Sequence, residues 1–410
     1  MRRQSRRRND LISTVSKHLT ISLSLIPRRR NSDSRQEASG FPLSGGRPRA
    51  YLGLFWSVGS ALFSFDIPGK LGVESCSGLA VVFRGSSVLT RSVATEVSPR
   101  IDAMTTVSVF GGSGFLGRRV VQRLADEGTT VRVAVRHADR ARTALRAAGL
   151  DRVTVFGADV RDQASVVAAV AGVDAVIDAV SAYVETGDLT FEAVHERGAE
   201  TLSREAAAAG VARFVLVSGI GADPESASRY IRARGRGERA VQQEFPGATI
   251  VRPSAMFGPG DALFGTLAHL ARVLPVLPLI GGGYSRLQPV YVENVAEAIA
   301  RTLADPATAG RTYEFAGPDV YTMRELVMIV LRIIGKQRLL VPVPFAVAEV
   351  QARLFELLPN PPLTTGQVDL LKADNTASGI LPGLRELNIQ PTSVEEVLPT
   401  YLGRSQRESG

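Results

Sequence analysis

Seven consecutive residues carry the clearest chemical signal in the chain: Gly111-Gly112-Ser113-Gly114-Phe115-Leu116-Gly117. Their glycines satisfy both G-x-G-x-x-G and G-x-x-G-x-x-G. In a loop between a strand and a helix, such glycines permit a tight turn, let the backbone approach a diphosphate and let the helix pack on the strand. Backbone N–H groups at the start of that helix also attract phosphate. The spacing therefore predicts a dinucleotide-binding loop, and a decayed loop with an empty crevice is the alternative.

The residues after the second predicted strand bear on which dinucleotide binds. An acidic side chain about 20 residues beyond the loop would bind the ribose hydroxyls of NAD. The chain has Arg136 and His137 there instead, with Arg140 and Arg142 close behind. Guanidinium groups suit a 2′-phosphate, so we predict NADP(H). NAD(H) remains the alternative, because arginines also solvate exposed helix starts.

Two further pairs of residues lie at or just beyond the ends of predicted strands. Asp159 and Val160 come after the third strand, where an adenine contact is expected, and Ala179 and Val180 lie at the end of the fourth. The carboxyl ends of parallel strands meet at one edge of the sheet, where such folds bind ligands. We therefore expect all four residues to line the cofactor site.

A serine, a tyrosine and an arginine are candidates for catalysis. Ser218 ends the fifth predicted strand, and Tyr230 and Arg234 lie one turn apart on one face of the next predicted helix. A tyrosine beside a fixed cation can act as a general acid or base if the cation favours its phenolate. The alternatives are that Tyr230 packs its ring in an amphipathic helix and that Ser218 is a turn residue.

The elements that would position these side chains alternate from Met104 onward. Strands are predicted at Thr105–Phe110, Thr130–Val135, Val153–Phe156, Asp174–Val180, Arg213–Ser218 and Ala248–Arg252. The helices between them include Gly114–Glu127, Gln163–Val170, Leu189–Ala209 and Ser226–Glu244. This alternation predicts an α/β fold with a Rossmann-type doubly wound parallel sheet over residues 104–256.

Prolines cluster after Pro253, and the rhythm of the chain changes there. We predict a smaller C-terminal α/β substrate lobe over residues 257–403, with a strand at Leu287–Val292 returning to the sheet and a tail at 404–410. A helix over Phe345–Leu358 has apolar residues at helical spacing. Core packing or a subunit contact is the expected role of that apolar stripe, ahead of a membrane-surface face.

The positive charge of the chain is confined to its first quarter. Residues 1–103 hold 16 Lys and Arg against 7 Asp and Glu, so the remainder of the +8 chain is close to neutral. This distribution argues against nucleic acid as a partner. Residues 1–103 are an upstream extension read from an earlier start codon, an Arg- and Ser-rich targeting segment, or a disordered arm.

Cysteine and histidine usage predicts no metal site. Cys76 is the only cysteine, which excludes an internal disulfide, and four scattered histidines lack paired ligand spacing. These counts fit a reducing, cytoplasmic location.

The sequence resembles the extended, atypical branch of the short-chain dehydrogenase/reductase superfamily. More narrowly, it is similar to bacterial relatives of the nucleotide-binding accessory subunit of respiratory complex I. The resemblance covers about residues 104–403. The segments that carry it are VFGGSGFLGRRVV, VSGIGAD, YIRARGRGE, VRPSAMFGPGD, PLIGGGYSRLQPVYVENVAEAI and YEFAGPDVYTMREL.

The resemblance implies a site with one altered residue. Active members carry a serine and Tyr-x-x-x-Lys, which map here to Ser218 and Tyr230, but Arg234 takes the lysine position. Arginine keeps the charge but is bulkier and planar, so it would still hold the nicotinamide ribose while hydride transfer is slowed or lost.

Two functions follow from this. The first is an NAD(P)H-binding protein with weak or no turnover and an accessory role in a respiratory or quinone-linked assembly, located peripherally at the inner membrane. A mitochondrial location would require residues 1–103 to be a transit peptide. The second is an NADP-dependent oxidoreductase or epimerase acting on a small carbonyl, quinone-type or sugar-nucleotide substrate.

Overall fold

The structure is a computed structural model, and it describes residues 106–356 and 363–403. The predictions for Met104, the first 103 residues, Leu357 and the tail at 404–410 lie outside these ranges. All the elements below therefore belong to the predicted Rossmann domain and the predicted C-terminal lobe.

A seven-stranded parallel sheet forms the centre of the first domain, with strand order β11-β6-β5-β4-β1-β2-β3. Its strands are β1 (Thr106–Phe110), β2 (Thr130–Val135), β3 (Thr154–Gly157), β4 (Ala175–Asp178), β5 (Arg213–Val217), β6 (Thr249–Pro253) and β11 (Thr312–Phe315). The order of the first six strands is that of the dinucleotide-binding fold, with its reversal between β1 and β4. The predicted fold class is confirmed.

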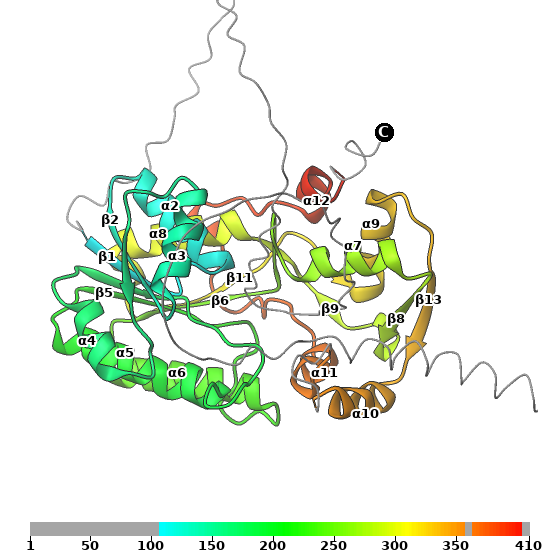
Figure 1. The fold of residues 1–410 in the computed structure, drawn as a ribbon, viewed down its shortest axis with the longest axis horizontal. Coiled ribbons are helices and arrows are strands. Elements are labelled where there is room, and N and C mark those ends of the chain that lie inside the picture. Colours follow the sequence, from blue (N-terminus) through cyan, green and yellow to red (C-terminus); the bar gives the residue numbers. More distant parts are fainter. Residues whose placement is uncertain (1–105, 357–362, 404–410) are drawn as a thin grey trace, which may run out of the picture. The chain divides into compact units, whose positions relative to one another are not determined.

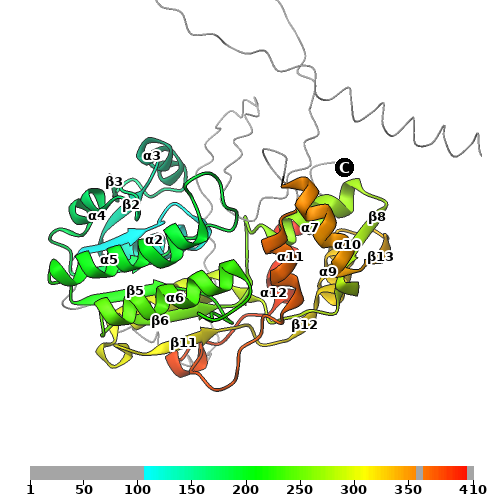
Figure 2. The same cartoon turned by 90° about the horizontal axis from the view of Figure 1, so that it is seen from below.

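Helices cover both faces of this sheet (Figure 1). On one face lie α2 (Phe115–Asp126), α3 (Ala138–Ala147) and α8 (Val292–Ala304), and on the other lie α4 (Gln163–Val170), α5 (Arg197–Ala208) and α6 (Arg229–Glu244), which are in front in Figure 2. Successive residues of a strand point to opposite faces of the sheet and so pack into two separate hydrophobic cores. Val107 and Val109 of β1 pack towards α2 and α8, whereas Phe110 packs towards α4 and α5. Period-2 alternation of a strand buried on both faces explains this division.

The C-terminal lobe has its own core between helices α7 (Leu263–Val273), α9 (Met323–Ile333) and α12 (Val394–Leu402). Strands β8 (Val276–Ile280) and β13 (Leu339–Val343) pair in parallel beside these helices. A buried carboxylate connects the first and last of them, because Asp261 accepts hydrogen bonds from the backbone N–H of Phe264 at 2.6 Å and from the Tyr401 hydroxyl at 2.5 Å. Asp261 therefore binds the first turn of α7 and holds α12 against it.

The predicted strand Leu287–Val292 does not return to the main sheet. It is split into β9 (Arg286–Leu287), which pairs with β12 (Tyr321–Thr322), and β10 (Val290–Tyr291), which pairs with β7 (Met256–Phe257). Pro289 lies at the break and has no N–H to donate to a ladder. The main sheet is extended by β11 instead, which pairs in parallel with β6.

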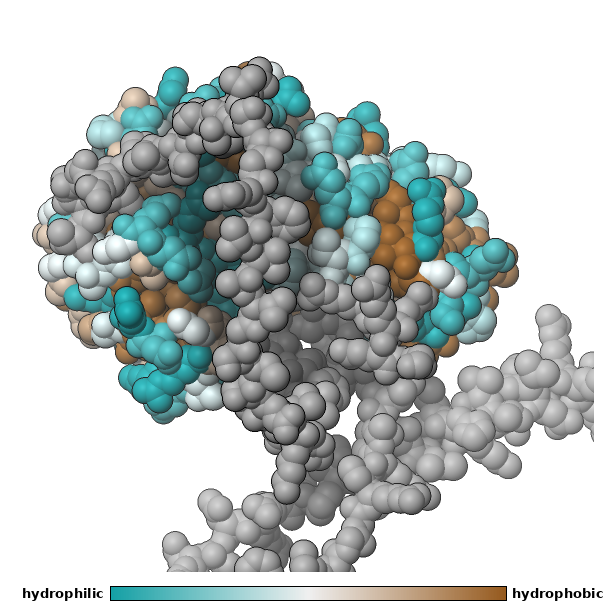
Figure 3. Space-filling model, turned by 90° about the horizontal axis from the view of Figure 1, so that it is seen from above, coloured by the Kyte–Doolittle hydropathy of each residue, from teal (hydrophilic) through white to brown (hydrophobic). Residues whose placement is uncertain are grey.

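The apolar stripe of α10 (Phe345–Phe355) faces solvent. Its members Val347, Val350 and Leu354 are 48%, 59% and 61% exposed, while Ala348 and Ala352 pack against α11 (Thr365–Lys372). These three side chains therefore do not pack in the core, and a subunit contact is the part of the expectation that stays a prediction. Brown apolar patches also interrupt the polar surface in Figure 3, including one at the right, on the side of the C-terminal lobe. Within the described ranges, no helix has the length and apolar content needed to cross a bilayer.

Candidate functional site

The glycine loop lies between β1 and α2, as predicted. Gly111 has a φ of +75°, and a side-chain carbon there would lie 2.6 Å from the carbonyl oxygen of Ala179. A side-chain carbon at Gly117 would lie 2.2 Å from the carbonyl oxygen of Gly111. These positions therefore require glycine: one brings the loop against the residues that follow β4, and the other lets α2 pack directly on the loop.

The start of α2 has no side-chain cap. Its N-cap residue is Gly114, and no acidic residue lies in its first turn. The first N–H groups of a helix need partners, and the positive end of the helix dipole favours an anion. An uncapped helix start behind a glycine cradle fits the diphosphate of a dinucleotide. Ser113, Phe115 and Leu116 lie in this loop and first turn, as the motif predicts.

Arg136 and His137 follow β2 and are both exposed. Among the described residues, Arg136 has no ion-pair partner, whereas Arg142 contacts Asp139 at 2.5 Å. Strands β2 and β3 pair in parallel, so Arg136 and Asp159, which follow them, lie at the same edge of the sheet. The pKa of Asp159 is lowered mainly by its hydrogen bonds with Arg161 and to a smaller extent by the charge of Arg136. Arg136 is therefore available to a further anion.

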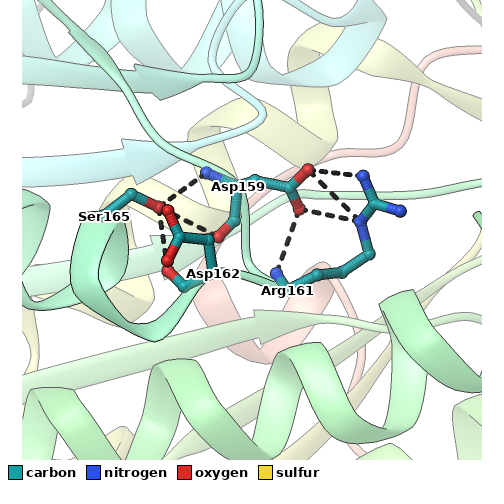
Figure 4. A network of polar contacts seen from close by, with 4 residues as sticks. All are labelled: Asp159, Arg161, Asp162 and Ser165. Atoms are coloured by element: carbon teal, nitrogen blue, oxygen red, sulfur yellow. Dashed lines mark hydrogen bonds and ion pairs between the residues drawn. The ribbon is translucent and has the colours of Figure 1, made fainter.

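Asp159 is held in place by a local polar network (Figure 4). The Arg161 side chain donates to both of its carboxylate oxygens, at 2.7 Å from Nη2 and 3.0 Å from Nε, and this bond is the main cause of the lowered pKa of Asp159. The backbone N–H of Asp159 donates to the Ser165 hydroxyl at 3.0 Å. Val160 is buried beside it. The loop after β3, where an adenine contact was predicted, is therefore held in one conformation. The sequence analysis did not identify Arg161 as the partner of the Asp159 carboxylate, because that contact depends on the conformation of this turn.

Arg234 and Tyr230 form a close pair on α6. The guanidinium carbon of Arg234 lies 4.9 Å from the centre of the Tyr230 ring. Arg234 also donates to the Ser181 hydroxyl at 3.0 Å, and its Nη1 atom would lie 3.2 Å from a side-chain carbon at Gly219. The cation therefore reaches the segments that follow both β4 and β5, and it ties α6 to the carboxyl edge of the sheet.

Tyr230 is enclosed by other aromatic rings. Tyr183 stacks on it at 5.5 Å, and Phe191 and His195 meet it edge to face at 5.3 and 5.5 Å. Burial raises the pKa of Tyr230 above its usual value, and this effect outweighs the opposing effect of Arg234. Tyr230 is therefore a neutral phenol at physiological pH, in the packed position that the sequence left as an alternative.

Ser218 lines a small buried pocket with Arg234, Asp178 and His195, whereas Tyr230 does not line it. The Ser218 hydroxyl and the Nε atom of Arg234 are both buried without a hydrogen-bond partner in the described part of the chain. Asp178 ends β4, where burial raises its pKa to about 6. The structure thus brings Ser218 and Arg234 together at one pocket, which Tyr230 does not line.

His195 and Asp178 were not singled out from the sequence. His195 lies in a π-helical turn (Glu192–Glu196) before α5, and its Nε2 atom lies 3.0 Å from the carbonyl oxygen of Ala182. Burial and then Arg234 lower its pKa to about 3, so it is neutral. Inserted π-helical turns are frequent at functional sites, but a single histidine in an apolar helix carries no signal of one. Asp178 could have been identified from the sequence as a candidate site residue, because it is an acidic residue at the end of an apolar strand.

Comparisons with known proteins agree with this geometry. Residues 111–271 match the NAD(P)H-binding domain family. The NADH dehydrogenase (ubiquinone) 1 alpha subcomplex subunit 9, mitochondrial, of Arabidopsis thaliana is 36% identical over 296 residues, which cover 69% of this chain and 74% of the relative. The ceramide reductase of Caulobacter vibrioides is 32% identical over 254 residues, which cover 59% of this chain and 75% of that relative.

Solved structures show the same fold. A dTDP-glucose 4,6-dehydratase from Streptomyces venezuelae, determined with NAD and TYD bound, superposes with a TM-score of 0.57 and 23% identity over 74% of this chain and 97% of that chain. The family match supports a nicotinamide nucleotide without distinguishing NAD(H) from NADP(H), and the Arabidopsis relative confirms the expected kinship with a complex I accessory subunit. The chain belongs to the family of NAD(P)H-binding proteins that includes the mitochondrial NADH dehydrogenase (ubiquinone) 1 alpha subcomplex subunit 9.

Proposed function

We propose that the protein binds NADP(H) tightly, turns it over weakly or not at all, and uses the bound nucleotide to stabilise a surface for a respiratory complex. The enclosed Tyr230 carries this proposal. A general acid or base needs a hydroxyl that can reach the reacting atom and a pKa near the working pH. Tyr230 is only 7% exposed, and its pKa is raised rather than lowered.

Arg136 supports the choice of NADP(H). It is exposed, lacks an ion-pair partner among the described residues and follows the second strand, where a dinucleotide-binding fold is expected to hold the adenosine ribose. A guanidinium can grip a 2′-phosphate through paired charge-assisted hydrogen bonds. NAD(H) offers no such anion, so it would leave Arg136 solvated and bind more weakly.

The partner and the location are proposed from the relatives and from the surface. The Arabidopsis relative is named as a mitochondrial subunit of NADH dehydrogenase. The exposed apolar stripe of α10, with Val347, Val350 and Leu354, is the kind of surface that subunit interfaces use. We place the protein at the cytoplasmic side of the inner membrane, held peripherally by the complex. A mitochondrial location follows only if residues 1–103 act as a transit peptide.

Reduction of a carbonyl or quinone-type substrate is the second candidate function. The observation that favours it is the 32% identity to a protein named ceramide reductase. Such chemistry would use Ser218 to polarise the carbonyl and Arg234 to hold the ribose. It would also require the aromatic residues around Tyr230 to open.

Mass analysis of the nucleotide retained through purification tests the proposed cofactor. We expect NADP(H) in the wild type and a preference shifted towards NAD(H) by about 10- to 100-fold in Arg136→Met, because one charge-assisted pair is lost. Arg142→Met is the matched control, since that arginine is engaged by Asp139. Retention of NAD(H) by the wild type would contradict the assignment of Arg136.

A further inference from the structure

Arg118 is a partly buried arginine that lacks a partner in the described ranges. Its Nε atom is buried and donates no hydrogen bond. Burial and then the adjacent Arg119 lower its pKa, and no carboxylate is among the causes. Arg119 contrasts with it, because its side chain contacts Glu293 at 3.1 Å and the carbonyl oxygen of Pro259 at 2.7 Å. An arginine withdrawn from water without an acceptor is unfavourable in the free protein.

The position of Arg118 adds to this cost. It lies in the first turn of α2, where the helix dipole is positive and no acidic residue compensates it. Helical side chains lean towards the N-terminus of their helix, so Arg118 covers the turn that follows the glycine loop. The helix dipole disfavours the positive charge of Arg118 at this end of α2, and a bound anion would compensate both.

The C-terminal lobe closes the other side of Arg118. A side-chain carbon at Gly260 would lie 3.9 Å from its Nη2 atom. The nearby acid of that loop is not available, because Asp261 accepts from the backbone N–H groups of Phe264 and Gly258 and from Tyr401. The guanidinium therefore lies beside the first loop of the C-terminal lobe, and its Nε atom has no hydrogen-bond acceptor in the described chain.

We propose that Arg118 binds the diphosphate of the dinucleotide from the side of the C-terminal lobe, opposite the backbone N–H groups of the glycine loop. This inference rests on the proposed nucleotide binding and adds a side chain to it. A planar guanidinium can donate two parallel hydrogen bonds to phosphate oxygens. Because Arg118 also adjoins Gly260, bound nucleotide would be held by both lobes, whereas Arg136 would recognise only the 2′-phosphate.

Three probes separate these contacts. NADPH carries both a diphosphate and a 2′-phosphate, ADP-ribose carries only the diphosphate, and adenosine 2′-monophosphate carries only the 2′-phosphate. We expect Arg118→Met to lower the affinity for NADPH and for ADP-ribose by about 10- to 100-fold and to leave the affinity for adenosine 2′-monophosphate unchanged. Arg136→Met should weaken NADPH and adenosine 2′-monophosphate and spare ADP-ribose. Arg123→Met is the control on the same helix, because Arg123 pairs with Glu127 and Glu297.

Thermal unfolding keeps the test independent of folding losses. Without nucleotide, Arg118→Met should unfold at the wild-type temperature or above it, because an unpaired charge is removed. When NADPH is added, the unfolding temperature of the variant should rise less than that of the wild type. Wild-type affinity of Arg118→Met for ADP-ribose would overturn this inference alone. A wild-type protein that bound neither NADPH nor NADH would instead contradict the proposed function.

Discussion

Arg234 lies over the face of the Tyr230 ring, with its guanidinium carbon 4.9 Å from the ring centre. The active enzymes that the chain resembles carry a lysine at this position, which acts on the tyrosine hydroxyl and on the nicotinamide ribose. Arg234 also favours the phenolate of Tyr230, but burial has the larger effect on its pKa, and the guanidinium donates to Ser181 as well. The pair therefore stabilises the packing of α6 against the carboxyl edge of the sheet.

Removing the Tyr230 hydroxyl should have little effect. In Tyr230→Phe we expect nucleotide affinity within about twofold of wild type and a loss of stability below about 1.5 kcal/mol, because the ring contacts remain. Tyr230→Ala should cost about 3–5 kcal/mol, because it empties a packed aromatic cluster. Denaturant unfolding and NADPH titration check both variants. A large loss of turnover in Tyr230→Phe would instead identify the hydroxyl as a catalytic group.

Restoring the lysine of active relatives should not restore activity. Arg234→Lys loses the planar group that reaches Ser181 and Gly219 together, so we expect a loss of about 1–3 kcal/mol in stability and no gain in NADPH oxidation. Arg236→Lys is the control, because that exposed side chain lies 4.0 Å from Glu196. Its stability should change by less than about 0.5 kcal/mol. Multiple turnovers by the lysine variant would show that Arg234 alone blocks chemistry.

His195 should make the fold sensitive to acid. Its pKa is lowered to about 3 in the folded protein, so its contribution to stability is fully present above pH 6.5 and is lost as the pH falls towards 3. In His195→Gln the free energy of unfolding should fall less steeply as the pH decreases through this window. By pH 3 the wild type should have lost on the order of 4 kcal/mol more stability than the variant. His137→Gln alters an exposed histidine and should keep the wild-type slope. Parallel slopes for all three proteins would refute the burial of a neutral His195.

Asp178 should act in the opposite direction. Burial raises its pKa to about 6, so the stability associated with its protonated form is present below pH 3.8 and is lost as the pH rises through 6. Asp178→Asn can keep the hydrogen bond from the backbone N–H of Val180. We expect this variant to be more stable than wild type at pH 8, by on the order of 2 kcal/mol, and similar at pH 4. Asp151→Asn, at an exposed position, is the control, and a destabilised Asp178→Asn at pH 8 would contradict the prediction.

The glycine loop should not tolerate a single added carbon. Gly117→Ala would place that carbon 2.2 Å from the carbonyl oxygen of Gly111, which is a backbone atom that cannot rotate away. We expect loss of retained nucleotide and a fall in the unfolding temperature. Gly265→Ala, in α7, is the control, because no atom lies within 4 Å and alanine favours the helix. Normal nucleotide retention by Gly117→Ala would contradict the proposed loop geometry.

Local signals in the sequence were sufficient for much of the fold. Helix α4 has the predicted ends at Gln163 and Val170, because Asp162 caps its start. Strands β1, β2, β5 and β6 follow from short apolar runs between turn residues. The pairing of β9 and β10 could not be predicted, because Leu287–Val292 looks like one strand until the partners on either side of Pro289 are known.

The places of the candidate residues in the fold were predictable where spacing alone defines them, as in the glycine loop and at the ends of β2 and β3, while their roles stay predictions. It was not predictable where distant segments meet. The enclosure of Tyr230 depends on Tyr183 and Phe191, and the missing partner of Arg118 depends on the loop around Gly260. No periodicity relates those residues in the sequence.

The central claim is that the protein holds NADP(H) without consuming it, and a turnover assay with bound NADPH tests this most directly. The fluorescence of stoichiometric NADPH would be followed in the presence of a panel of carbonyl and quinone acceptors. We predict a signal that persists for wild type and Tyr230→Phe alike. Repeated oxidation of added NADPH by the wild type, abolished in Tyr230→Phe, would contradict the account and establish the protein as an oxidoreductase.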